Sequence, residues 1–154
     1  MDGNPLVINA LNINLANEIT AINQYIVHAG IVRNWGYTKL ADYIQARADE
    51  EREHSQKLID RIRFLNGIPI ASKINYVNIA YDVPTQFLND KTKELESIKS
   101  YNDAIALCVE IGDNSTRSYL EEILNDEINH ELIIEGNLTQ IDQMTLQNYL
   151  SIQV

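Results

Sequence analysis

Apolar side chains recur along most of the chain at intervals of three and four residues, which is the period of one face of an α-helix. Glycine and proline, with six and three copies, interrupt this pattern at only a few points. The main interruptions are Gly36, Gly67 with Pro69, Pro84 and Gly112. Pro84 suits the first turn of a helix, where proline is tolerated. We therefore predict four long helices, followed by a short fifth helix at Leu146–Leu150.

Each predicted long helix has one mostly apolar stripe, which we expect to face the core. The four stripes are Leu11, Leu15, Glu18, Ile22, Tyr25 and Ala29; Ile44, Arg47, Glu51, His54, Leu58, Ile62 and Leu65; Phe87, Lys91, Glu94, Ile98, Tyr101, Ile105 and Cys108; and Leu120, Ile123, Glu127, His130, Ile134, Leu138 and Ile141. Every stripe carries charged residues near its middle, where a core would be apolar. These charges indicate chemistry in the interior.

The connections between the stripes predict the topology. The turns at Trp35-Gly36 and Gly112–Asn114 are short, so helices one and two should be antiparallel, as should helices three and four. The connection Ile68–Val83 has 16 residues. It can span up to roughly 53 Å when extended, whereas a helix of about 27 residues is roughly 40 Å long. One long crossover between two helical hairpins is the ferritin-like arrangement of an all-α four-helix bundle.

The crossover also carries five apolar side chains: Ile74, Tyr76, Val77, Ile79 and Tyr81. We therefore expect this loop to lie against protein rather than in water. The length of 154 residues fits one domain over residues 1–154.

Composition excludes several classes of function. The net charge of −10, from 22 acidic and 12 basic residues, leaves no basic patch and argues against nucleic acid as a partner. No run of about 18 apolar residues predicts a membrane span. The single cysteine, Cys108, rules out an internal disulfide and any Cys-x-x-Cys metal site. With no export signal at the start, we expect a cytoplasmic protein. The acidic surplus suits attraction of cations, but it equally fits a solvated surface.

Six acidic and imidazole side chains in the stripes form an internal repeat. They are Glu18, Glu51, His54, Glu94, Glu127 and His130. In each half of the chain the second glutamate follows the first by 33 residues, a histidine comes three residues later, and the two halves are offset by 76. Tyr25 and Tyr101 obey the same offset. The halves therefore look like two copies of one hairpin, related by a pseudo-twofold axis.

This pattern predicts a site for two metal ions. Glu and His at positions i and i+3 project from one helix face, so one metal can engage both. Four carboxylates in an apolar interior would repel each other and be costly to desolvate, and two divalent cations remove that charge. Carboxylates with imidazoles suit iron or manganese, and this arrangement is the known one of di-iron carboxylate bundles. The alternative is a metal-free polar network in the core.

Along essentially its whole length the chain resembles bacterioferritin. The resemblance is carried by Asn17–Tyr25, Asn34-Trp35-Gly36, Asp126-Glu127 with His130, and Leu146–Leu150. It implies that Glu18 and Glu94 are terminal ligands and that Glu51 and Glu127 bridge the two irons. His54 and His130 would each complete one iron.

The resemblance further implies iron storage by a ferroxidase. Two Fe(II) per subunit would be oxidised by O2 or H2O2, and ferric mineral would be kept in a shell of twenty-four subunits. The fifth helix would cluster at the fourfold axes, and a ferredoxin-type reductant would serve iron release. The competing functions are a di-iron peroxidase or oxygenase like rubrerythrin and a non-catalytic partner subunit. The first lacks a rubredoxin-like Cys-x-x-Cys module here, and the complete ligand set argues against the second.

Three further residues receive an interpretation beside the ligands. Tyr25 matches a family tyrosine that can supply an electron during oxygen reduction, although a core tyrosine with a hydrogen-bonded hydroxyl is an equal alternative. Tyr101 has no such match and is interpreted as packing. His28 lies off the glutamate stripe, and we expect it on the surface or in a subunit contact.

Two positions depart from the family pattern. Bacterioferritin binds haem between two subunits through a methionine at the position that is Arg52 here, and the only methionines are Met1 and Met144. We therefore expect a shell without bis-methionine haem, or co-assembly with a second, haem-binding subunit. An inner-surface iron site of some members uses a histidine and an aspartate where this chain has Ala46 and Glu50, so that site is not expected.

Overall fold

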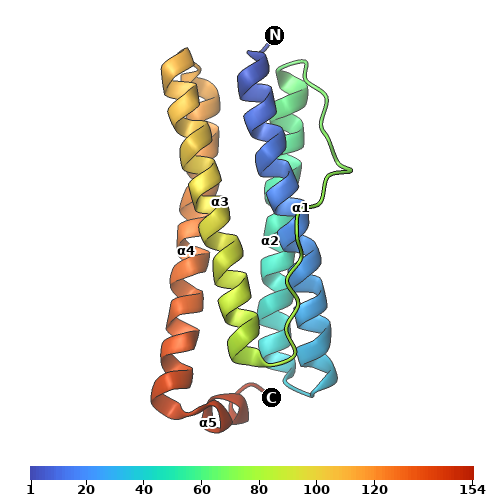
Figure 1. The fold of residues 1–154 in the computed structure, drawn as a ribbon, viewed down its shortest axis with the longest axis vertical. Coiled ribbons are helices and arrows are strands. Elements are labelled where there is room, and N and C mark those ends of the chain that lie inside the picture. Colours follow the sequence, from blue (N-terminus) through green and yellow to red (C-terminus); the bar gives the residue numbers. More distant parts are fainter.

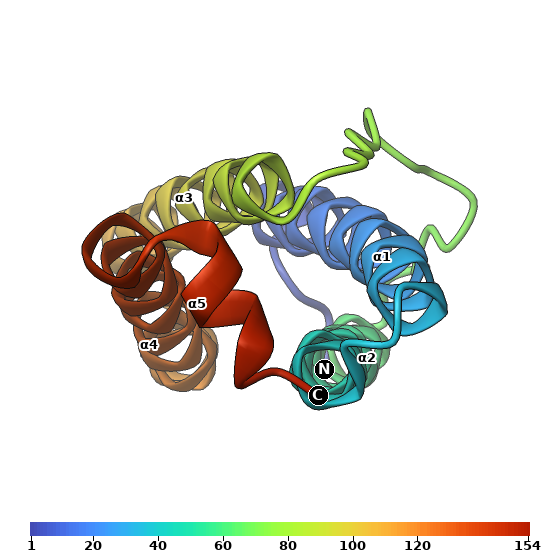
Figure 2. The ribbon, with the colours of Figure 1, turned by 90° about the horizontal axis from the view of Figure 1, so that it is seen from below.

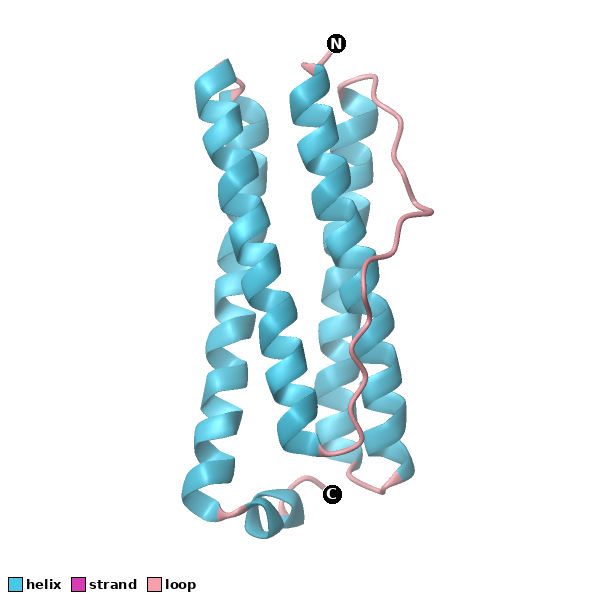
Figure 3. Cartoon of the chain, viewed as in Figure 1, coloured by secondary structure: helices cyan, strands magenta, loops and turns pink.

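The computed structural model describes residues 1–154 and consists of helices joined by loops (Figures 1 and 3). The helices are α1 (Pro5–Asn34), α2 (Thr38–Phe64), α3 (Val83–Ile111), α4 (Asn114–Met144) and α5 (Leu146–Ser151). None of them combines the length and the apolar character that crossing a bilayer would require. The predicted all-α architecture, with its long crossover and short terminal helix, is confirmed.

Helix ends fall where the sequence places capping residues. The side chains of Asn4, Asp82 and Asp113 accept hydrogen bonds from backbone N–H groups in the first turns of α1, α3 and α4. Gly112 ends α3 with φ of 84°, a left-handed conformation that glycine adopts without strain. These local signals divide the chain into helices before any long-range packing forms.

The four long helices form two antiparallel hairpins. In each, the helices pack along their whole length, and the hairpins meet mainly through α1 and α3. The end-on view in Figure 2 shows α2 and α4 on the side away from that contact, with α5 crossing the end of the bundle between them. The contact between α2 and α4 is smaller than that between α1 and α3. It includes polar bonds such as His54–Asp126, His130–Glu50 and Tyr119 to the Lys57 carbonyl.

The core consists of two apolar clusters rather than one. Toward the N-terminal end of α1, Leu11, Leu15 and Leu58 belong to one cluster; near α5, Ala29 and Phe87 belong to the other. The predicted stripe residues are buried or half-buried throughout. Between the clusters lies a belt of buried charged residues, which the candidate metal centre occupies.

The crossover from residue 65 to 82 is held by a column of polar side chains on α1. It consists of Asn12, Thr20, Gln24 and His28, which share one helix face because they are four or eight residues apart. Asn12 accepts a hydrogen bond from the Ile70 backbone N–H at 2.8 Å, and Thr20 accepts one from Asn75 at 2.8 Å. Gln24 accepts one from Asn78 at 3.0 Å, and His28 accepts one from Ala80 at 3.1 Å. The extended chain thus meets hydrogen-bond acceptors along the helix.

Most apolar side chains of the crossover are exposed. Its backbone lies against α1, but Ile74 is 52 % exposed, and Tyr76 and Tyr81 are each 76 % exposed. Only Val77 and Ile79 are half-buried. The segment lies against protein as predicted, but backbone hydrogen bonds rather than packing of its apolar side chains hold it there.

The prediction that His28 lies on the surface or in a subunit contact was wrong. It is fully buried, and its Nδ1 lies 2.9 Å from Asp90 Oδ1 while its Nε2 accepts the Ala80 N–H. Because Nε2 is an acceptor, the ring proton is on Nδ1 and is donated to Asp90. Gln24 Nε2 donates to the same Asp90 oxygen at 2.8 Å. His28 therefore joins α1, α3 and the crossover.

The C-terminal segment folds back onto its own bundle. Tyr149 of α5 is fully buried, its hydroxyl donates to Asn137 Oδ1 at 2.6 Å, and its ring meets Phe87 edge-on. The Gln153 carbonyl accepts the Lys39 N–H at 2.9 Å. This bond serves an otherwise uncapped end of α2, whose N-cap residue Tyr37 makes no side-chain capping bond.

We predict that His28→Ala lowers the free energy of unfolding by about 2–4 kcal/mol, because it leaves the Ala80 N–H unpaired and deprives buried Asp90 of a donor. Urea denaturation followed by circular dichroism measures the change. Asn17→Ala is the control, because it removes only the exposed bond from Asn75 Nδ2 and should cost less than about 0.5 kcal/mol. Equal losses in the two variants would contradict the role of the polar column.

Candidate metal centre

All six side chains predicted as ligands meet in the middle of the bundle. Glu18 comes from α1, Glu51 and His54 from α2, Glu94 from α3, and Glu127 and His130 from α4. Each is at most 3 % exposed. The four helices thus place their charged positions at one level, between the two apolar clusters.

Their ligand atoms form two overlapping groups. Glu18, Glu51, His54 and Glu127 form one group, and Glu51, Glu94, Glu127 and His130 form the other. Within each group the ligand atoms lie within 4.8 Å of one another. Glu51 and Glu127 belong to both groups, whereas Glu18 and Glu94 each belong to one. The shared pair has the placement of bridging ligands, and the other two that of terminal ligands.

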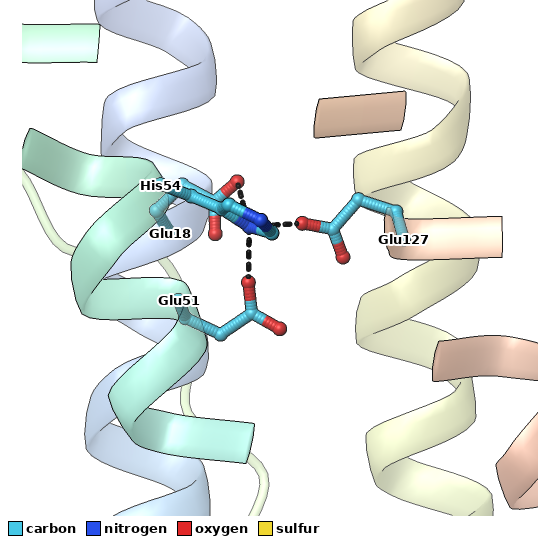
Figure 4. Close-up of side chains that lie close together, drawn as sticks. All are labelled: Glu18, Glu51, His54 and Glu127. Atoms are coloured by element: carbon cyan, nitrogen blue, oxygen red, sulfur yellow. Dashed lines mark hydrogen bonds and ion pairs between the residues drawn. The ribbon is translucent and has the colours of Figure 1, made fainter. Parts of the chain in front are cut away.

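Both histidines turn Nδ1 toward the carboxylates. Figure 4 shows His54 between three glutamates, with Nδ1 at 2.9 Å from Glu51, 2.8 Å from Glu127 and 3.8 Å from Glu18. His130 Nδ1 lies 3.1 Å from Glu51 and 3.7 Å from Glu94. The two rings are stacked, with centroids 6.0 Å apart. Nδ1 is therefore the nitrogen that each ring could offer to a metal.

The outer nitrogen of each ring meets a carboxylate that the sequence had not assigned to this role. His54 Nε2 lies 3.1 Å from Asp126 Oδ2, and His130 Nε2 lies 2.7 Å from Glu50 Oε2. Such a carboxylate holds the proton on Nε2 and leaves the Nδ1 lone pair free for a metal. Glu50 and Asp126 obey the offset of 76, so the repeat contained a signal for both.

Both carboxylate oxygens of Glu50 make contacts. Its second oxygen forms an ion pair with Arg47 on the same helix, and Ala46, one turn earlier, is exposed and has no ligand atom. Glu50 thus contacts both Arg47 and His130.

Two buried tyrosines complete the polar belt. The Tyr25 hydroxyl donates to Glu94 Oε1 at 2.5 Å, and the Tyr101 hydroxyl donates to Glu18 Oε1. The interpretation of Tyr101 as packing alone was therefore incomplete. Burial and the charge of Glu94 raise the pKa of Tyr25 well above its usual value, and burial and Glu18 do the same for the pKa of Tyr101. Both hydroxyls keep their protons as donors.

Protons are shared unevenly among the ligands. Burial and the charge of Glu51 raise the pKa of Glu18 well above its usual value, and burial with Glu18 does the same for the pKa of Glu127. Burial also acts to raise the pKa of Glu51, but the hydrogen bonds with His130 and His54 outweigh it and hold that pKa well below the usual value.

The histidines shift in the direction of the charged form. Burial acts to lower the pKa of His54, but its hydrogen bond with Glu51 and the charge of Glu18 raise it to about 9. Burial also opposes the charge on His130, yet its bonds with Glu127 and Glu51 raise its pKa to about 12. The positively charged rings thus balance the negative charge of the glutamates.

The donor set fits two divalent cations. Glu18 Oε2 and Glu94 Oε2 are buried oxygens without a hydrogen-bond partner. Unpartnered buried carboxylate oxygens are costly unless something positive binds them. Carboxylates and imidazoles without thiolates suit iron or manganese. Without a cation the cluster relies on protons and charged histidines to balance its glutamates.

Comparisons with known proteins agree with this geometry. The sequence pattern of the Ferritin-like domain family matches residues 8–144. Bacterioferritin of Mycolicibacterium paratuberculosis is 35 % identical over 149 residues, 97 % of this chain and 94 % of that protein. Bacterioferritin of Streptomyces coelicolor is 36 % identical over 151 residues, 98 % of this chain and 90 % of that protein.

Solved structures include a close match in fold. Rhodobacter capsulatus bacterioferritin, described with a metal-free dinuclear site and a haem iron in a crystallographic special position, superposes with a TM-score of 0.98 at 31 % identity. The match covers 100 % of this chain and 96 % of the other. On the matched sequence pattern, the extent of identity and the shared fold, the chain belongs to the bacterioferritin family of ferritin-like proteins.

Proposed function

We propose that the chain stores iron and that its metal centre is a ferroxidase, which oxidises Fe(II) to Fe(III) with O2 or H2O2. The observation that carries this proposal is that two complete ligand groups overlap within one subunit and share Glu51 and Glu127. Two metal ions held by shared carboxylates are close enough to give one electron each to the same oxidant. Fe(II) is the substrate, and the ferric product moves on to storage.

The chain's own residues provide binding, charge balance and proton acceptors. Two Fe(II) ions carry four positive charges, which match the four glutamates. Each histidine offers Nδ1 to one iron while Asp126 or Glu50 holds its outer nitrogen. The apolar clusters on both sides keep bulk water from the belt, which strengthens each electrostatic contact. The six residues Glu18, Glu51, His54, Glu94, Glu127 and His130 are thus the proposed catalytic and metal-binding set.

Storage requires a hollow assembly, and we propose a cytoplasmic shell of twenty-four subunits that encloses the ferric mineral. Membership of the bacterioferritin family supports it. Exposed apolar residues on single subunits also support it, since Ile68, Tyr76 and Tyr81 are each 76 % exposed and would be covered by neighbouring subunits. Iron release then needs a reductant, for which a ferredoxin-type protein is a suitable class.

The haem position favours a refinement of this proposal. Arg52 is exposed near the middle of α2. Met1 precedes α1 and Met144 ends α4, so both methionines lie at the ends of the bundle. A homo-oligomer of this chain would then lack a methionine pair for haem. The chain would either form a haem-free shell or supply the iron-oxidising subunit of a mixed shell that contains a haem-binding subunit.

Iron loading distinguishes storage from a rubrerythrin-type peroxidase or oxygenase. Fe(II) added to the metal-free protein in air should be oxidised rapidly at two per subunit and then continue to load far beyond that ratio, as followed by ferric absorbance. Glu18→Ala and His130→Ala should each slow the fast phase by at least roughly 100-fold, because even residues behind metal ligands are worth roughly 10–100-fold. Glu110→Ala, which removes an exposed glutamate of α3, should leave the rate unchanged. Saturation at two irons per subunit would contradict storage.

Metal binding should release protons and strengthen as the pH rises. Because the pKa of His54 is raised to about 9 and that of His130 to about 12, both rings are protonated at pH 7 and must lose a proton to bind metal. We expect at least two protons per subunit, measured by calorimetric Co(II) titration in buffers of different ionisation enthalpy. The affinity should increase with pH up to at least about 9. Binding without proton release would contradict the charged state of the two histidines in the metal-free protein.

The haem content of the purified homo-oligomer tests the Arg52 interpretation. Protein expressed alone in a haem-sufficient host should show no six-coordinate bis-methionine spectrum and no stoichiometric haem by pyridine haemochrome assay. Co-purification with natural partners, with the mass of the assembly measured, separates a haem-free shell from a mixed one. A bis-methionine spectrum from the homo-oligomer would refute the interpretation.

A further inference from the structure

Each of the two tyrosines in the polar belt donates its hydroxyl to a glutamate in the other half of the bundle. Tyr25 of α1 donates its hydroxyl to Glu94 of α3, and Tyr101 of α3 donates its hydroxyl to Glu18 of α1. Both tyrosines are at most 1 % exposed. The two bonds run in opposite directions across the contact between α1 and α3, and they reach the two glutamates that belong to one ligand group each.

Each glutamate accepts a tyrosine bond through one oxygen only, although the oxygen nearer the histidine differs: Glu18 Oε1 lies 3.8 Å from His54 Nδ1, and Glu94 Oε2 lies 3.7 Å from His130 Nδ1. In Glu18 and in Glu94 the tyrosine occupies Oε1, and Oε2 is buried without any hydrogen-bond partner. A carboxylate held through one oxygen cannot rotate freely, so its other oxygen has a fixed direction before a metal arrives. Such preorganisation lowers the cost of binding.

Packing alone does not account for the hydroxyl of Tyr101. Its ring belongs to the apolar cluster that contains Leu15 and Leu58, where phenylalanine would fill the same volume without a polar atom to bury. A buried hydroxyl needs a partner, and the partner here is a proposed metal ligand. The pseudo-twofold repeat places Tyr101 and Tyr25 in equivalent positions.

We propose that Tyr101 is a positioning residue of the metal centre, which fixes the orientation of the Glu18 carboxylate beside His54 before a metal binds. Tyr25 does the same for Glu94 beside His130. The ligand class is a divalent first-row transition metal. This inference rests on the proposed di-metal function and deepens it: each glutamate that belongs to one ligand group has its own tyrosine.

The test is Co(II) binding to metal-free protein, measured by calorimetry and visible absorption. Crystals grown at limiting Co(II) show by anomalous scattering which position is filled. In Tyr101→Phe the affinity at the Glu18–His54 position should fall roughly 10–100-fold, the usual effect of removing a residue behind a ligand, while the Glu94–His130 position is kept. Tyr25→Phe should have the opposite pattern.

Tyr149→Phe is the matched control, because it also removes a buried tyrosine hydroxyl but one that donates to Asn137 rather than to a ligand. It should bind two Co(II) per subunit as the unmodified chain does. Full Co(II) affinity at both positions in Tyr101→Phe would overturn the role of Tyr101 and leave the di-metal proposal intact. Failure of the unmodified chain to bind two ions would overturn both.

A second measurement holds even if Tyr101→Phe does not fold. Co(II) binding should perturb the ultraviolet absorption of a tyrosine bonded to a ligand. In Tyr25→Phe the perturbation should persist, because Tyr101 remains on Glu18. Complete loss of the tyrosine signal in Tyr25→Phe would show that Tyr101 does not sense the metal, and the proposal would fail.

Discussion

The bundle is built around four glutamates buried in its middle, and most of its other polar features follow from that constraint. Carboxylates removed from water repel each other and are costly to desolvate. Each of the four meets a compensating group: histidines contact Glu51 and Glu127, and tyrosines donate to Glu18 and Glu94. The apolar core is split into two clusters because this belt passes between them. The oxygens that remain without a hydrogen bond, Glu18 Oε2 and Glu94 Oε2, are ones that two cations would satisfy.

Residues of the metal centre follow the pseudo-twofold repeat, whereas the residues that hold the crossover do not. Ligands, tyrosines and the carboxylates behind the histidines all recur at the offset of 76. The polar column on α1 does not: Asn12, Thr20, Gln24 and His28 correspond to Leu88, Glu96, Ser100 and Ala104 on α3. The difference has a simple cause, because only α1 has the crossover lying against it. Where the repeat is kept the contact is with the metal centre, and where it is broken the contact is with the crossover.

The sequence predicts what depends on spacing and fails where contacts depend on partners from other elements. Helix number, the long connection and the meeting of the six ligands all followed from periodicity and repeats. His28 was expected at the surface because its partners, Asp90 and the Ala80 N–H, come from α3 and the crossover. The tie of Tyr101 to Glu18 was missed because it spans 83 residues. Glu50 and Asp126 share the offset of 76, but as half-exposed acids they were not assigned a role beside the histidines, and these contacts came from the three-dimensional structure.

The two hairpins meet through α1 and α3 on one side and through α2 and α4 on the other. On the first side the residues of the centre are buried, whereas on the second they reach solvent-exposed carboxylates. Along α1 and α3 the terminal glutamates are held by fully buried tyrosines. Along α2 and α4 the histidines reach Asp126 and Glu50, whose side chains are 51 % and 44 % exposed. Each ring therefore keeps its Nε2 proton hydrogen-bonded to a carboxylate that is in contact with water, while the proton on Nδ1 is the one that a metal would displace. The α1–α3 side fixes ligand geometry, whereas the α2–α4 side connects the buried charges to solvent, and a centre that exchanges protons for metal requires both.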